Sequence, residues 1–208
     1  MGKTALLVID MQNDFCLPGA PFEVPGAMGV IPFIKQALHA CRENGLPVVH
    51  VFRYYRGDGS DVEITRYNRF VQVGGGCIEG TEGAKIVEEL KPMPGDYLVT
   101  KQRWSAFFQT ELDNLLRRLG VDQVVVTGVQ TPNCIRGTVW DANSLDYEVI
   151  VLTDATGAKT EEVHQANLLD MQNIGIKLMT TSEFISLVPD VPTHNLRQQI
   201  QKKLRKND

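Results

Sequence analysis

The feature that most constrains the fold of this chain is a regular alternation of short apolar runs with longer helical patterns. The apolar runs, rich in valine, isoleucine and leucine, occupy residues 4–9, 47–52, 96–100, 123–127, 148–153 and 176–180. Stretches with helical patterning lie between them, at 30–44, 84–91, 109–120 and 160–175. Because the apolar runs are continuous rather than alternating, they are typical of strands buried on both faces of a sheet. We therefore predict an α/β fold, a three-layer α/β/α sandwich with a six-stranded, mostly parallel, Rossmann-like sheet.

A single domain is expected over residues 1–208. The chain shows no internal repeat, and no stretch rich enough in proline, glycine or serine to act as a linker. Residues 54–83 form one long irregular segment, and a segment of this length is typical of a lid, a binding loop or a subunit contact. The basic tail, at about 194–208, is expected to be a solvated terminus.

The composition argues against several classes of partner. A net charge of −4 and a pI of about 5.6 do not give the basic surface that nucleic-acid binding requires. No apolar run approaches the roughly 18 residues of a membrane span, and the first residues do not resemble a signal peptide. We therefore expect a cytoplasmic protein without nucleic-acid or membrane partners, whose four irregularly spaced cysteines are free thiols.

Reactive side chains follow three of the predicted strands. The first strand runs into Asp10 in "LLVIDMQNDF", the third ends at Lys101, and the fourth leads through "VQTPNC" to Cys134. In open α/β sheets, ligands bind at the carboxyl ends of the strands. These three residues are therefore the first candidates for a site. Asp154, which follows the fifth strand, is expected to cap the next turn.

The local sequence around Cys134 predicts the start of a helix. Thr131 is a suitable N-cap and Pro132 suits the first helical position, where its missing N–H costs nothing. Cys134 would then lie in the first turn, where backbone N–H groups and the helix dipole favour a thiolate. The residue is therefore a candidate nucleophile, and a buried structural cysteine is the alternative interpretation.

Asp10 and Lys101 are candidate partners of the Cys134 thiol. Asp10 is a candidate proton acceptor, and Lys101 supplies a positive charge that favours both anions. Taken singly, an acid after a strand often caps a turn and a lysine there is usually solvated. The hypothesis depends on the three residues together.

Three segments resemble the signature segments of the isochorismatase-like cysteine hydrolases: "LLVIDMQNDF", "KQRWSAF" and "VTGVQTPNCIRGTVWDA". The resemblance extends from about residue 4 to 185. It implies an Asp10–Lys101–Cys134 triad and a cis peptide bond at Val129–Gln130, with the backbone amides of Gln130 and Cys134 forming an oxyanion hole. It also implies hydrolysis of a small amide or ureide C–N bond through a thioester, in a homodimer or homotetramer.

The resemblance departs from the nicotinamidases in one respect. Those members carry an Asp-x-His metal site after the second strand, with a further histidine. Here Asp58 and Asp61 are present, but no histidine follows before His164, and His50 lies within a strand as a core residue would. The sequence therefore predicts a metal-independent amidohydrolase of the nicotinamidase-related branch, with no metal and no cofactor.

Four further residues are predicted to contact the substrate: Phe15, Trp104, Arg53 and Gln12. The two aromatic residues are candidate pocket walls, with core packing as the alternative. Arg53, in a segment rich in arginine and tyrosine, suits a carboxylate or ureide through paired hydrogen bonds, with a surface or subunit contact as the alternative. His164, Cys16 and Cys77 are left outside the chemistry.

Two other functions compete with the hydrolase. A catalytically silent binding or scaffold protein would keep the fold, although an intact set of three reactive residues weighs against it. Nicotinamidase is the alternative enzyme. A dinucleotide-dependent oxidoreductase is excluded, because "DMQNDF" follows the first strand in place of a GxGxxG turn.

Overall fold

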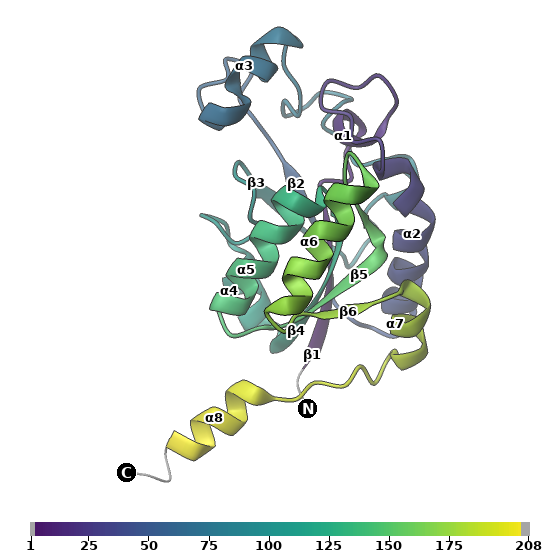
Figure 1. Cartoon of the computed structure of the whole chain (residues 1–208), viewed down its shortest axis with the longest axis vertical. Coiled ribbons are helices and arrows are strands. Elements are labelled where there is room, and N and C mark those ends of the chain that lie inside the picture. The colour runs from purple at the N-terminus through teal and green to yellow at the C-terminus, as the bar shows by residue number, and fades with distance from the viewer. Residues whose placement is uncertain (1–2, 205–208) are drawn as a thin grey trace.

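The computed structural model describes residues 3–204, apart from the side chains of residues 197 and 198. Its centre is a six-stranded sheet (Figure 1). The strands are β1 (Lys3–Ile9), β2 (Val48–Arg53), β3 (Tyr97–Lys101), β4 (Val121–Val129), β5 (Glu148–Gly157) and β6 (Lys177–Met179). They lie in the order β3-β2-β1-β4-β5-β6, and every pairing is parallel. The predicted fold class is confirmed, and the sheet is wholly parallel within the described residues.

Helices cover both faces of the sheet. On one face lie α2 (Ala27–Glu43) and α7 (Thr181–Leu187), and on the other lie α4 (Leu112–Arg118), α5 (Arg136–Ser144) and α6 (Glu161–Asn173) (Figure 1). Two separate hydrophobic cores fill the two interfaces. This double burial explains why residues 4–9 of β1 are all buried and why this central strand shows no polar alternation.

Two predicted segments differ from the structure. Residues 84–91 do not form an α-helix and contain only the short 3-10 helix η1 (Glu88–Leu90). Their backbone instead serves the segment after β1: Val87 N–H donates to Met11 O, and Ile86 forms an isolated bridge with Gln12. Residues 54–83 are not wholly irregular, because they contain helix α3 (Ile64–Gln72), which stands away from the sheet (Figure 1).

The remaining helices are short. Helix α1 (Asn13–Cys16) follows β1, and the π-helical turn η2 (Thr131–Ile135) joins β4 to α5. Helix α8 (Leu196–Leu204) takes up most of the basic tail. Residues 205–208, at the end of that tail, lie outside the described part of the chain. No helix between residues 3 and 204 combines the length and the apolar content needed to cross a bilayer.

A close approach of β1 and β4 fixes the centre of the sheet. Gly128 has φ +109°, and a Cβ atom there would lie 2.1 Å from Ile9 O. Only glycine permits both this backbone conformation and this contact. The strand order reverses between β1 and β4, which is where open parallel sheets bind ligands.

Candidate active site

Three reactive side chains meet at the carboxyl edge of the sheet. Lys101 Nζ donates to Asp10 Oδ2 over 2.8 Å and lies 3.5 Å from Cys134 Sγ. It also donates to Arg103 O over 3.1 Å, so three acceptors fix the ammonium group. Asp10, Lys101 and Cys134 are each at most 3% exposed. A buried ammonium shared by a carboxylate and a thiol stabilises the negative form of both groups.

The backbone of Asp10 is held in an uncommon conformation. Its φ is +53°, in the left-handed region that aspartate tolerates better than most residues. The Asp10 N–H donates to Val51 O over 2.8 Å, which ties the strand end to β2. Of the two carboxylate oxygens, Oδ2 accepts from Lys101, while the buried Oδ1 has no hydrogen-bond partner among the described residues. Oδ1 therefore has a free lone pair for a proton.

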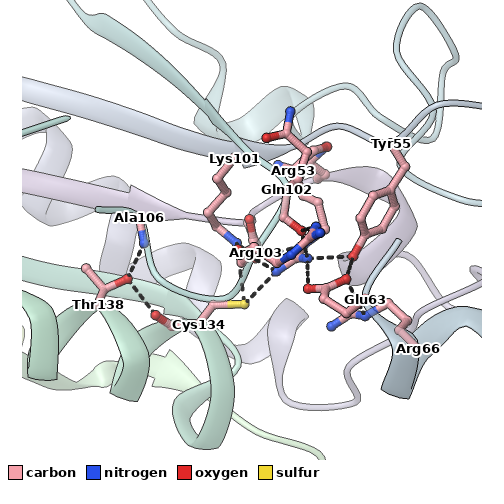
Figure 2. Close-up of polar contacts among 12 residues, drawn as sticks. Arg53, Tyr55, Glu63, Arg66, Lys101, Gln102, Arg103, Ala106, Cys134 and Thr138 are labelled. Atoms are coloured by element: carbon pink, nitrogen blue, oxygen red, sulfur yellow. Dashed lines mark hydrogen bonds and ion pairs between the residues drawn. The ribbon is translucent and has the colours of Figure 1, made fainter. Parts of the chain in front are cut away.

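Cys134 lies in the π-helical turn η2, not in the first turn of a regular α-helix. The prediction of Thr131 as N-cap is wrong: Gln130 occupies that position, and Thr131 Oγ1 instead lies 2.8 Å from His164 Nδ1. Pro132 stands at the start of the turn as predicted. Thr138 Oγ1 donates to Cys134 O over 2.6 Å and accepts from Ala106 N–H, which joins α5 to the segment after β3 (Figure 2).

The residue before this turn presents an unused backbone donor. The Val129–Gln130 peptide bond is cis. Gln130 O accepts from the N–H groups of Asn133 and Ile135, whereas the Gln130 N–H donates to no acceptor within residues 3–204. This free amide stands four residues before the thiol, at the end of β4.

Arg53 does not lie where a substrate contact would. Its side chain is fully buried, and its guanidinium points at the thiol (Figure 2). Nη2 lies 3.4 Å from Cys134 Sγ, and Nε lies 3.9 Å from Asp10 Oδ2. The two Nη atoms also donate to Gln102 O and Arg103 O, each over 3.0 Å. The prediction that Arg53 contacts the substrate is therefore corrected: its guanidinium is a second cation at the thiol.

Glu63 and Tyr55 hold this guanidinium from the other side. Arg53 Nη1 donates to Tyr55 Oη over 2.5 Å and to Glu63 Oε1, and Tyr55 Oη donates to Glu63 Oε2. Burial raises the pKa of Glu63, but the Arg53 charge and the tyrosine hydrogen bond outweigh it and hold that pKa below its usual value. Glu63 was not among the predicted site residues, because nothing in its local sequence distinguishes it from a solvated acid.

Gln12 is also not a substrate contact. Its side-chain Nε2 donates to Arg53 O and Ala84 O, each over 2.8 Å, and its Oε1 accepts from Arg53 N–H over 2.7 Å. With the amide fully used and the residue fully buried, Gln12 braces the end of β2. Phe15 is 2% exposed and stacks on Phe22 in the core, with centroids 5.9 Å apart, so core packing accounts for it.

Trp104 is the predicted contact that faces open space. It is 42% exposed and lines two adjoining cavities of about 860 and 810 Å³. The first cavity is mainly apolar and lies between the α3 segment and α5, with Phe108 and Trp140 in its wall. The second includes Gln130 and Asn133, the neighbours of the candidate nucleophile. Trp104 remains a predicted substrate contact.

The residues in the region of the nicotinamidase metal site do not fit a metal. Asp58 Oδ1 accepts from Ser60 N–H and Asp61 Oδ1 accepts from Arg56 N–H, each over 2.9 Å. Both carboxylates thus close local turns, and no group of three histidine, cysteine, aspartate or glutamate side chains between residues 3 and 204 has metal-binding geometry. We assign no step to a metal.

The two predicted non-catalytic histidines are both buried. His50 Nε2 lies 3.1 Å from Asp96 Oδ2, and burial lowers the pKa of His50 despite that carboxylate. His164, which the sequence leaves outside the chemistry, bridges Thr131 Oγ1 and Thr153 O. Asp154 is not at the end of β5, which runs on to Gly157, and its carboxylate accepts from Thr181 at the start of α7.

The other cysteines show no comparable setting. Burial raises the pKa of Cys16 and of Cys41 to about 12, and raises that of Cys77. Thiols with these values stay protonated at neutral pH and are poor nucleophiles. In contrast to these three, Cys134 has two basic side chains within 3.5 Å of its sulfur.

Comparisons with known proteins identify the family of this chain. Residues 4–183 match the isochorismatase domain model. The chain is 47% identical over 185 residues to a probable inactive nicotinamidase of Arabidopsis thaliana, covering 88% of this chain and 94% of that protein. It is 32% identical over 205 residues to the ureidoacrylate amidohydrolase RutB of Agrobacterium fabrum, covering 89% and 90%.

A solved structure of the same family shares the fold of this chain. The crystal structure of an isochorismatase family protein from Desulfovibrio vulgaris superposes with a TM-score of 0.86 at 48% identity, covering 90% of this chain and 99% of that one. The domain match, the identities and the shared fold all extend over most of the molecule. The chain therefore belongs to the isochorismatase family.

Proposed function

We propose that this protein hydrolyses the C–N bond of a small amide or ureide, with Cys134 as nucleophile, Asp10 as proton acceptor and Lys101 as the cation between them. The observation that carries the proposal is the shared ammonium, 2.8 Å from Asp10 Oδ2 and 3.5 Å from Cys134 Sγ. Amidohydrolases among the relatives support the reaction class.

In the first half of the reaction, Asp10 takes the proton of the Cys134 thiol. The thiolate attacks the carbonyl carbon, and the carbonyl oxygen becomes an oxyanion. The free N–H of Gln130, with that of Cys134, forms the proposed oxyanion hole. Asp10 then gives its proton to the departing nitrogen, the C–N bond breaks, and a thioester to Cys134 remains.

In the second half, Asp10 takes a proton from water, and the resulting hydroxide attacks the thioester. The C–S bond breaks, Cys134 leaves as a thiolate that recovers its proton, and the acid product departs. One water is consumed for each C–N bond cleaved. Arg53 adds a second positive charge at the sulfur, and because its guanidinium cannot deprotonate, this charge persists throughout the cycle.

Substitutions at the two reacting side chains test the proposal. We expect the protein to hydrolyse at least one member of a panel of small primary amides and ureides that includes nicotinamide. Asp10→Asn should lower kcat/KM by about 10²–10⁴-fold, since it removes the proton acceptor, and Cys134→Ala should abolish turnover. Cys41→Ala, a change at a buried thiol on α2, serves as the matched control and should retain activity.

A silent binding protein is the second candidate, because a relative with 47% identity is described as probably inactive. The same panel of amides and ureides distinguishes the hydrolase from the silent binding protein. Turnover that disappears in Cys134→Ala supports the hydrolase. A folded wild type with no turnover, and with a Cys134 that iodoacetamide labels no faster than Cys41, supports the silent protein.

We also infer a homodimer or homotetramer. Exposed apolar side chains support it: Ile64 is 94% and Val71 59% exposed on α3, and Phe108 is 49% exposed beside the mainly apolar cavity. Sedimentation equilibrium should give two or four times the chain mass of 23.2 kDa. A monomer at micromolar concentration would contradict the inference.

A further inference from the structure

A cavity of about 810 Å³ is lined by residues of the turn that leads to Cys134 and by parts of the chain that are far apart in sequence. Gln130 and Asn133, which flank the cis peptide and the thiol turn, form its inner wall. Its outer walls come from the segment around Pro21, from α3, and from the start of α6. A substrate whose carbonyl reached Cys134 would extend its remaining atoms into this space.

The charges in this cavity oppose those of the whole chain. The protein has a net charge of −4. The cavity, however, is lined by three basic residues, Arg66, Arg69 and Lys159, and by one acidic residue, Glu23. The carboxylate of Glu23 accepts a hydrogen bond from Gly19 N–H over 2.8 Å, which commits part of its acceptor capacity to its own loop.

The three basic residues differ in how far they are neutralised. The Arg66 guanidinium lies over the rings of Phe15 and Phe22, 5.7 and 5.3 Å from their centroids, and its Nε is 4.0 Å from Glu63. Arg69 donates to Pro21 O over 3.2 Å. Neither Arg69 nor Lys159 has a carboxylate partner within 4.0 Å among the described residues. These two cations therefore keep their charge available for a ligand.

We propose that Arg69 and Lys159 bind a carboxylate carried by the substrate, so that the substrates of this site are amido acids or ureido acids rather than neutral amides. The proposal rests on the proposed hydrolase, because it takes Cys134 as the point of attack. Two exposed cations give modest attraction in water, and charge-assisted hydrogen bonds to one carboxylate make that attraction selective.

The test uses protection of Cys134 from iodoacetamide, followed by mass spectrometry of each cysteine. The competitors are three amido acids of increasing length, malonamate, succinamate and glutaramate, each compared with the diamide of the same length. For at least one length, the amido acid should protect at a concentration ten or more times lower than its diamide. This advantage should fall at least threefold in Arg69→Gln and in Lys159→Gln.

Lys35→Gln is the matched control, since it removes one exposed positive charge from α2, away from the cavity, and should leave the advantage unchanged. Equal or absent protection by acid and diamide at all three lengths would overturn the carboxylate site, as would an undiminished advantage in the Arg69→Gln/Lys159→Gln double variant. The labelling rate without competitor reports separately on the nucleophile. If Cys134 is then no more reactive than Cys41, the proposed hydrolase fails, and the carboxylate site fails with it.

Discussion

The Arg53 guanidinium joins the candidate nucleophile to a segment that lies outside the sheet. Its Nη2 is 3.4 Å from Cys134 Sγ, while its Nη1 donates to Glu63, immediately before α3 (Figure 2). The group is fully buried and uses backbone carbonyls, a phenol and a carboxylate as acceptors. The position of α3 and the electrostatics of the thiol are therefore linked through one side chain.

Arg53→Gln should destabilise the fold strongly. The change removes the cation and leaves Glu63 without the fully buried guanidinium that it accepts from, and breaking such a buried pair costs about 3–5 kcal/mol. Urea unfolding measures the free energy of unfolding. Arg118→Gln, an exposed arginine on α4, is the control and should change that energy by less than about 0.5 kcal/mol. A loss below about 1 kcal/mol in Arg53→Gln would show that the network contributes little.

The contact between β1 and β4 predicts a large effect of one methyl group. In Gly128→Ala, the new Cβ would lie 2.1 Å from Ile9 O at a φ of +109°, so the central strands must separate. We expect a loss of more than about 3 kcal/mol in the free energy of unfolding. Gly120→Ala is the comparison, because Gly120 has φ +69° with no atom within 4 Å of the new Cβ. It should cost about 1 kcal/mol, from conformational strain alone. Equal losses in the two variants would contradict the close contact.

His50 predicts a pH dependence of stability. Burial holds the pKa of His50 below its unfolded value of about 6.5 in spite of the nearby Asp96. In the window below pH 6.5 the unfolded chain binds more protons than the folded one, so this contribution to stability is complete above pH 6.5 and is lost as the pH falls. Urea unfolding between pH 7.5 and 5 should therefore show declining stability in the wild type and a shallower decline in His50→Gln. Identical slopes would show that His50 is not the group responsible.

Much of the fold follows from the sequence, because the pattern that predicts it is also what stabilises it. Continuous apolar runs form strands that must be covered on both faces, and this requirement predicts a sheet between two layers of helices. The convergence of Asp10, Lys101 and Cys134 was predictable for the same reason. Parallel strands end at one edge, so residues that follow β1, β3 and β4 gather there.

The parts that could not be predicted depend on contacts between distant residues. Gln12 and Arg53 are polar, and from sequence alone each side chain could equally bind a ligand or form hydrogen bonds within the protein interior. Only the folded chain shows that the Gln12 amide is used by the backbone of residues 53 and 84, and that Glu63 accepts from Arg53. The helical pattern at 84–91 was misleading for a related reason. Its backbone pairs with the residues after β1, and those tertiary hydrogen bonds outweigh local propensity.

The most direct test of the central claim is the pH dependence of Cys134 alkylation in the wild type and in Lys101→Met. This substitution keeps an unbranched side chain of similar length but removes the ammonium that Asp10 and Cys134 share. Rates of labelling by iodoacetamide, resolved for each cysteine by mass spectrometry, give the pH of half-maximal reactivity. We predict that this pH is at least one unit higher in folded Lys101→Met than in the wild type, because the thiolate has lost one of the two cations beside it. The same midpoint in both proteins would contradict the claim that Asp10, Lys101 and Cys134 act as one catalytic unit.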